Sequence, residues 1–167
     1  MVELKKFLAD GMVGRLSRWM RLIGCDVTYL SAAQDEQLIQ KAAAENRVLL
    51  TSDTVLYRLA VARGVEAFLV KGNSEADKLA RVTKRFGIRL EVDTSTSRCP
   101  TCGSLIESVS KDSVKARVPP TTFEAYEEFW ICTNPKCRKV YWQGSHWKKI
   151  HELLKEANQL ATAKKQQ

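Results

Sequence analysis

Four of the five cysteines of this chain fall into two close pairs, and no other feature of the sequence limits its fold as strongly. The pairs are Cys99-Pro-Thr-Cys102 and Cys132-Thr-Asn-Pro-Lys-Cys137. A turn of two to four residues lets two thiolates reach the same Zn²⁺ at about 2.3 Å, and the Pro and Asn residues within the pairs favour such turns. The spacing therefore predicts a zinc ribbon. Two disulfides or four unrelated buried thiols are the alternatives.

The composition indicates the cellular location expected for this protein. The hydrophobic fraction of 44% is normal for a globular protein, and no run of about 18 apolar residues predicts a membrane span. The first ten residues lack the apolar stretch of a signal peptide, so we expect a cytoplasmic, reducing location where paired thiols more often bind metal than each other. The fifth cysteine, Cys25, is expected to be a small buried hydrophobe.

The charge of the chain is basic. The net charge of +8 divides into +3 for residues 1–93 and +5 for residues 94–167. A basic surface attracts phosphate backbones through counterion release. Because the same charge can serve solubility alone, it leaves nucleic-acid binding open.

Short apolar segments alternate with amphipathic ones over the first 92 residues. Strands are expected at 4–9, 27–30, 48–51, 67–70 and 88–92, and helices at 12–23, 35–46, 54–63 and 75–86. The helical segments repeat their apolar residues every three to four positions, and Gly24 and Gly87 are expected to end two of them. Alternation of this kind predicts an α/β fold with a parallel sheet flanked by helices, whose binding site lies beyond the carboxyl ends of the strands.

These patterns divide the chain into four parts. An α/β domain over 1–93 is followed by a polar linker over 94–98, the zinc ribbon over 99–150, and a helical tail over 151–167. The tail helix is expected to start near Lys148 and to fray over 164–167.

Acidic residues follow two of the expected strands directly. Asp10 and Asp53 would converge at one edge of the sheet if their strands were neighbours, and Asp35 at the start of a helix is a natural third member. Clustered carboxylates need a cation, and oxygen ligands favour Mg²⁺ or Mn²⁺, which can activate water for phosphodiester cleavage. Asp35 and Asp53 could equally stabilise helix N-termini, so the residues alone leave both interpretations open.

Motifs in both halves of the chain are similar to those of a known family. In the first half they are Phe7–Leu16 (FLADGMVGRL), Arg18–Asp26 (RWMRLIGCD), Asp35-Glu36, Ala42–Glu45 and Arg47–Asp53 (RVLLTSD). In the second half they are Arg98–Cys102 (RCPTC), Val118-Pro119-Pro120 and Tyr141–Trp147 (YWQGSHW). Together they resemble the PIN-like Mut-seven C-terminal RNase domain family to about residue 150.

This resemblance implies a PIN-like fold, divalent-metal-dependent RNA cleavage and a structural zinc. The family's acids carry over onto Asp10, Asp35 and Asp53, which would hold one or two Mg²⁺ or Mn²⁺ ions. The zinc would be held by Cys99, Cys102, Cys132 and Cys137.

The sequence also departs from the family pattern. Ser52 stands where an Arg commonly precedes the third acid, Gly103 stands where an Asn commonly follows the first cysteine pair, and the second pair has four intervening residues instead of two. A fourth acid, common in PIN nucleases, has three candidates: Glu75, Asp77 and Asp93.

Two groups of residues are expected to contact RNA. Arg15, Arg18 and Arg21 recur every three residues, either as a phosphate track near the first acid or as a solvated helix face. The second group consists of Trp142, His146, Trp147, Lys148 and Lys149. Its aromatic side chains could stack on bases and its lysines could bind phosphates. For Trp142, packing within the ribbon is the commoner role.

We therefore expect the protein to be a metal-dependent ribonuclease. Its zinc ribbon would dock RNA or a ribonucleoprotein, and the ribosome and tRNA are the candidate partners. The acids would orient and deprotonate a water for in-line attack, leaving a 3′-hydroxyl and a 5′-phosphate. The main alternative is a PIN-like protein that binds RNA or the ribosome without cutting it. A third is the nuclease half of a toxin–antitoxin pair.

Overall fold

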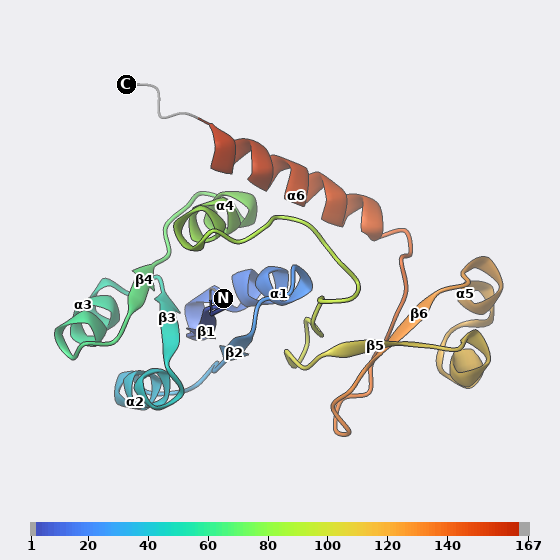
Figure 1. The fold of residues 1–167 in the computed structure, drawn as a ribbon, viewed down its shortest axis with the longest axis horizontal. Coiled ribbons are helices and arrows are strands. Elements are labelled where there is room, and N and C mark those ends of the chain that lie inside the picture. The colour runs from blue at the N-terminus through green and yellow to red at the C-terminus, as the bar shows by residue number, and fades with distance from the viewer. Residues whose placement is uncertain (1–2, 164–167) are drawn as a thin grey trace.

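A four-stranded parallel sheet forms the centre of the N-terminal part of the computed structural model, which describes residues 3–163 (Figure 1). The strands are β1 (Lys6–Ala9), β2 (Val27–Tyr29), β3 (Arg47–Thr51) and β4 (Ala67–Leu69), in the order β2-β1-β3-β4. The register of β1 and β3 pairs Ala9 with Leu50. The expected parallel α/β class is confirmed, and β1 and β3 are neighbours.

Helices cover both faces of this sheet. One face carries α2 (Asp35–Glu45) and α3 (Thr54–Ala62). The other carries α1 (Gly14–Leu22), preceded by the 3₁₀ turn η1 (Gly11–Val13), and α4 (Glu75–Phe86). Val48, Leu49 and Leu50 of β3 are all buried, which explains the uninterrupted apolar sequence of that strand.

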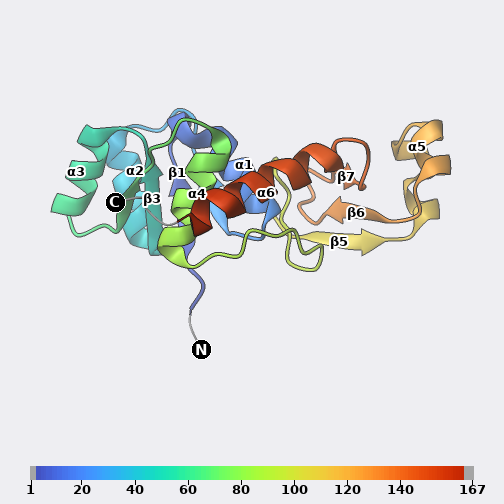
Figure 2. The ribbon, with the colours of Figure 1, turned by 90° about the horizontal axis from the view of Figure 1, so that it is seen from above.

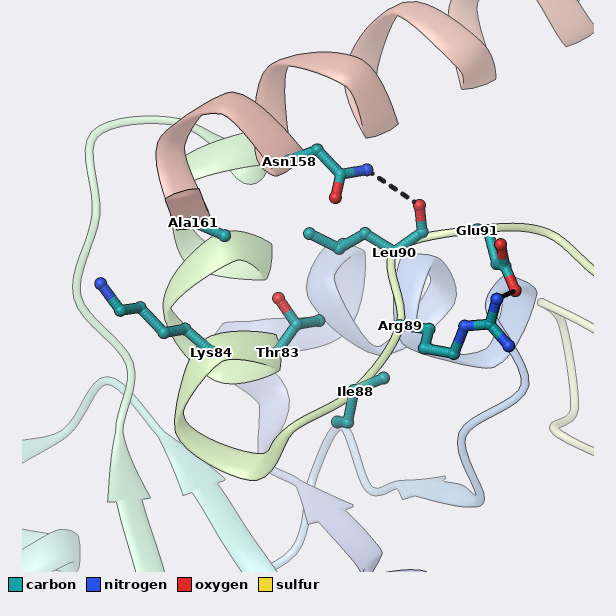
Figure 3. A pocket seen from close by; sticks show the side chains of 8 residues that line it. All are labelled: Thr83, Lys84, Ile88, Arg89, Leu90, Glu91, Asn158 and Ala161. Carbon is teal, nitrogen blue, oxygen red and sulfur yellow. Dashed lines mark hydrogen bonds and ion pairs between the residues drawn. The ribbon is translucent and has the colours of Figure 1, made fainter. Parts of the chain in front are cut away.

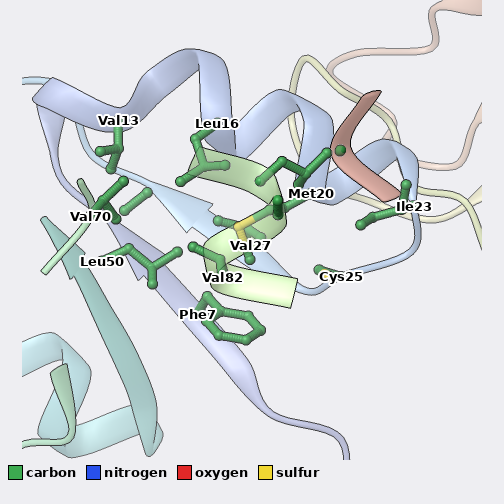
Figure 4. Close-up of a cluster of buried hydrophobic side chains, with 14 of the residues drawn as sticks. Phe7, Val13, Leu16, Met20, Ile23, Cys25, Val27, Leu50, Val70 and Val82 are labelled. Atoms are coloured by element: carbon green, nitrogen blue, oxygen red, sulfur yellow. The ribbon is translucent and has the colours of Figure 1, made fainter. Parts of the chain in front are cut away.

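The larger of the two cores lies between the sheet and α1 and α4 (Figure 4). Phe7, Val27 and Leu50 of the sheet meet Leu16 and Met20 of α1 there. Cys25 belongs to the same core, and burial raises the pKa of its thiol to about 12, so it is the neutral small hydrophobe expected from the sequence.

The fifth strand expected over 88–92 is wrong. This segment has no regular secondary structure and does not join the sheet. Ile88, Leu90 and Val92 pack against the larger core as a strand pattern would require. However, the Leu90 carbonyl accepts a hydrogen bond from Asn158 Nδ2 at 3.0 Å (Figure 3). The helix that carries Asn158 thus takes the place of a neighbouring strand.

That helix is α6 (Trp147–Thr162), which runs from the ribbon back onto α4 (Figures 1 and 2). Leu154 and Ala157 are buried in the larger core. The fraying expected over 164–167 lies outside the described residues. Among residues 3–163, no helix combines the length and apolar character needed to cross a membrane.

The ribbon is a separate antiparallel sheet of β5 (Ile106–Val109), β6 (Phe129–Cys132) and β7 (Val140–Tyr141). The 3₁₀ segment η2 (Lys111–Arg117) and α5 (Pro120–Ala125) form its far end (Figure 2). Trp142 packs against the small core of this part, with its ring centroid 6.3 Å from that of Phe129, which is the structural role anticipated for it.

Candidate active site and metal centre

The four paired cysteines converge on one point of the ribbon. Their sulfur atoms all lie within 4.8 Å of one another, with Cys99 Sγ 3.8 Å from Cys137 Sγ and Cys102 Sγ 3.4 Å from Cys132 Sγ. Zn–S bonds of about 2.3 Å in a tetrahedron place the sulfurs roughly 3.8 Å apart, so this set fits the ion. All four cysteines are free of disulfides. They could therefore hold a metal ion such as zinc, despite the wider second pair.

Gly103 forms the turn that closes the first pair. Its N–H donates to the Cys99 carbonyl at 2.8 Å, and its φ of +82° lies in the left-handed region. A Cβ at this position would lie 2.9 Å from Arg21 Nε and 3.0 Å from the Val27 carbonyl oxygen. The Gly found where the family commonly has Asn thus meets both a backbone and a space requirement.

Arg21 joins α1 to the first cysteine pair. Its side chain is buried, Nε donates to the Val27 carbonyl at 2.9 Å, and Nη1 donates to the carbonyls of Pro100 and Thr101 at 3.1 and 3.3 Å. Burial lowers the pKa of this guanidinium from its ordinary value. Arg21 is therefore a structural link, and it belongs neither to a phosphate track nor to a solvated face.

Asp10 and Asp53 bond to the same threonine at the carboxyl edge of the sheet. Asp10 is buried; its Oδ2 accepts a hydrogen bond from the Thr51 hydroxyl, and its Oδ1 accepts one from the Met12 N–H at 3.0 Å. Thr51 Oγ1 in turn accepts the Asp53 N–H at 3.0 Å. Asp53 Oδ1 caps α3 by accepting two N–H groups of its first turn, at 2.8 and 3.2 Å. The predicted cap is confirmed, and both acids lie at the ends of neighbouring strands, with Asp53 joined to Thr51 through its backbone.

Thr51 was not identified from the sequence. The available signal was a hydroxyl residue at the end of an otherwise apolar strand, two positions before an acid. Its partner Asp10 could not be read from that signal, because the register of β1 and β3 decides which residues face each other.

Asp35 begins α2 after β2, at the same edge of the sheet, and it is exposed. Over residues 3–163, the cysteines are the one group of three or more His, Cys, Asp or Glu residues whose ligand atoms all lie within 4.8 Å of one another. Asp10, Asp35 and Asp53 therefore share an edge without forming a tight triplet.

Glu75 is the candidate fourth acid that lies nearest the loop after β1. It opens α4 and lines a cavity of about 580 Å³ together with Gly11 and Arg15. Its Oε1 pairs with Lys78 at 3.2 Å, whereas its Oε2 is buried without a hydrogen-bond partner among the described residues.

The other two candidates for a fourth acid are engaged elsewhere. Asp77 pairs with Arg81 at 2.9 Å, and this hydrogen bond holds the pKa of its carboxyl below the usual value. Asp93 accepts hydrogen bonds from the Ser95 hydroxyl and N–H, and these lower its pKa in the same way.

Most of the residues expected to contact RNA line two cavities. Arg15 and Arg18 are exposed and line the cavity that contains Glu75. Arg18 also lines a second cavity, of about 270 Å³, together with His146 and Trp147. Lys148 is exposed on the first turn of α6 and does not line either one.

Comparison with known proteins fits this arrangement. The sequence pattern of the Mut7-C RNAse domain matches residues 5–154. The chain belongs to the Mut7-C RNAse domain family. The Mut7-C match spans both the sheet with its acids and the ribbon with its cysteines, and it indicates a ribonuclease-like function with RNA as the substrate class.

A solved structure also shows some similarity to this Mut7-C chain. It is a domain of a functionally unknown protein from Methanocaldococcus jannaschii DSM 2661, with 20% identity over 42% of this chain and 77% of that chain and a TM-score of 0.27. No curated protein matches the sequence.

Proposed function

We propose that this Mut7-C protein is a metal-dependent ribonuclease whose reaction takes place at the carboxyl edge of the parallel sheet. The observation that carries the proposal is the pair of hydrogen bonds through which Thr51 holds Asp10 and Asp53 at the ends of neighbouring strands. Asp35 and Glu75 follow the two outer strands at the same edge.

These carboxylates would hold one or two Mg²⁺ or Mn²⁺ ions. Mg²⁺ usually keeps several waters and takes only one or two protein carboxylates, so it does not need a tight triplet of acids. When bound, such an ion lowers the pKa of a water and neutralises charge that develops on a phosphate. Asp10 and Asp53 are the inner pair, whose orientation the Thr51 hydroxyl and nearby backbone N–H groups fix. Asp35 and Glu75 would bind the metal ions, directly or through water, from the outer side of this pair.

The ribbon would place RNA relative to these acids. Its cysteines would hold a structural zinc, and the basic side chains of Arg15 and Arg18 lie between the ribbon and the acidic edge. The partner would be RNA, either free, as tRNA or as part of the ribosome. We expect the protein to meet it in the cytoplasm. Backbone phosphates bound by these arginines would orient the chain without selecting its sequence.

The decisive test is cleavage of labelled RNAs with Mn²⁺ and with EDTA, by the wild type and by Asp53→Asn. Asn caps helices about as well as Asp, so we expect the variant to fold and bind zinc while its metal-dependent cleavage falls at least a hundredfold, because a charged ligand is lost. Asp112→Asn, in η2 of the ribbon, should cleave like the wild type. Cleavage retained by Asp53→Asn would rule out the proposed site.

The main rival is a protein that binds RNA without cutting it. It would show salt-sensitive RNA affinity, no Mn²⁺-dependent product and no effect of Asp53→Asn. The buried position of Asp10 favours the enzyme, because a buried carboxylate that forms no salt bridge among the described residues costs free energy unless it serves a ligand. Glu75 Oε2 points the same way, since it has no hydrogen-bond partner in the described part of the chain although Oε1 pairs with Lys78.

A further inference from the structure

A second cavity lies where the ribbon meets the α/β part. Its volume is about 270 Å³, and it is bounded by α1, the segment 92–101, the ribbon strands and the first turn of α6. Four aromatic side chains contribute to its wall: Trp130, Tyr141, Trp142 and Trp147. Because these elements are distant in sequence, only the folded chain forms this cavity.

The charge around this cavity is entirely positive. Arg18, Arg98 and Lys139 are among its lining residues, and no Asp or Glu is. Lys139 Nζ donates to the Thr101 hydroxyl at 3.1 Å, and Arg98 Nη1 donates to the Gly103 carbonyl at 3.1 Å, so both cations are held in place. An apolar aromatic wall with a cationic rim complements a planar base attached to phosphates.

The size of the cavity limits its occupant. Pockets for drug-sized ligands span roughly 300 to 1,000 Å³, so this cavity suits one small planar group. A docked helix or strand would need a longer groove with paired backbone groups.

The walls are held in place before any ligand arrives. The Trp142 ring packs on Phe129, and a Cβ added to Gly144 would lie 2.8 Å from Trp142 Nε1, so only Gly allows this approach. The Trp147 ring meets the His151 ring edge-on with centroids 5.4 Å apart.

The cavity shares part of its wall with the larger cavity that contains Glu75 and Gly11. Arg18 and Thr101 line both this cavity and the one of about 580 Å³ that reaches Gly11 and Arg15, beside Asp10. An RNA strand could insert one base between ribbon and α1 while its phosphates pass Arg18 and Arg15 toward the acids.

We propose that this junction cavity is a nucleobase-binding pocket, which holds one unpaired base of the RNA at a fixed position along the strand from the cut. The inference rests on the proposed ribonuclease function and adds to it a requirement for single-stranded RNA. Trp147 is the stacking residue, and Arg18 binds the adjacent phosphate.

The test uses a short, mixed-sequence single-stranded RNA in which 2-aminopurine replaces each base in turn, bound by wild-type protein in EDTA. We expect fluorescence quenching to peak at one position. An abasic nucleotide there should weaken binding roughly tenfold, as should Trp147→Ala. Trp147→Phe should restore most of the affinity, because Phe keeps a stacking face. Trp19→Phe is the control, since Trp19 packs on the larger core and does not line the cavity.

The outcomes separate this inference from the proposed function. Uniform or absent quenching with the wild type overturns the pocket, whether or not the protein cuts RNA with Mn²⁺. Quenching at one position that survives Trp147→Ala also overturns it. Position-specific quenching that Trp147→Ala removes, in a protein that cuts no RNA, would retain the pocket and refute the ribonuclease. The scan of the wild type needs no variant and stays decisive if Trp147→Ala fails to fold.

Discussion

Thr51 has the most consequential single side chain in the acidic region. It is fully buried, donates its hydroxyl proton to Asp10 and accepts the N–H of Asp53. A hydroxyl can do both because it carries one donor and two acceptor lone pairs. One small residue thereby couples the ends of two strands and links the Asp10 carboxylate to the backbone of Asp53.

Replacing Thr51 by Val tests this coupling. The shape is kept, but a buried carboxylate oxygen and a partly buried N–H lose their partner, so the free energy of unfolding should fall by about 1–3 kcal/mol. The Mn²⁺ concentration needed for half-maximal cleavage should rise. Urea denaturation and Mn²⁺ titration measure the two effects. Thr51→Ser keeps the hydroxyl and should lose less in both, and equal losses in both variants would contradict this role.

At the scale of elements, the cysteine turns and α1 form one unit. The Arg98 N–H donates to the Arg21 carbonyl at 2.9 Å, and the Ser97 hydroxyl donates to the Leu22 carbonyl at 2.7 Å. The Arg21 side chain returns two hydrogen bonds to the first cysteine turn. The segment expected to be a linker is thus anchored to the end of α1.

Loss of the metal should therefore raise amide hydrogen exchange in α1 as well as in the ribbon. We expect Cys132→Ser, or chelation, to raise amide hydrogen exchange in β5–β7 and at the C-terminal end of α1, while β3 remains protected, because metal binding is coupled to folding of the ribbon. Cys25→Ala, which removes a buried thiol outside the cluster, should keep one zinc per chain. Exchange confined to the ribbon would show that the link through Arg21 carries no stability.

On the scale of the whole molecule, α6 fixes how the ribbon sits on the α/β part. It starts beside the ribbon and packs along α4, which brings Leu154 and Ala157 into the main core (Figure 2). The basic helix α1 then lies between the acidic edge and the aromatic cavity. RNA that spans both would meet the positive charge of Arg18 and Arg15 before it reached the acids.

The salt dependence of RNA binding measures this path. Each phosphate neutralised on a single strand contributes about −0.7 to the slope of log affinity against log salt. Arg15→Ala should make the slope shallower by about that amount and weaken binding equally for all sequences. Lys84→Ala, near the C-terminal end of α4 and thus at the opposite edge of the sheet, is the control. Equal slopes for Arg15→Ala and wild type would remove Arg15 from the RNA path.

The sequence by itself determined the elements with local causes. The helix over Glu75–Phe86, which Gly87 ends, follows from its apolar period, and the closeness of the two thiols within each pair follows from the turn between them. The meeting of the two pairs depends on the pairing of β5 with β6. The positions of Asp10 and Asp53 directly after two strands made them candidates for one edge, on the condition that the strands are neighbours, which the sheet order meets.

Tertiary structure alone decided what depends on contacts between distant segments. The alternating apolar residues of 88–92 are compatible both with a strand of the sheet and with an irregular segment packed against α6. The hydrogen bond from Asn158 Nδ2 to the Leu90 carbonyl shows that the segment packs against α6. Arg21 follows Arg15 and Arg18 at intervals of three residues, a pattern typical of an exposed helix face. It is nevertheless buried against a segment about eighty residues later in the sequence, whose carbonyls accept its hydrogen bonds. Periodicity records which side of a segment is buried; it does not record the partner that buries it, and the partner decides the role of the residue.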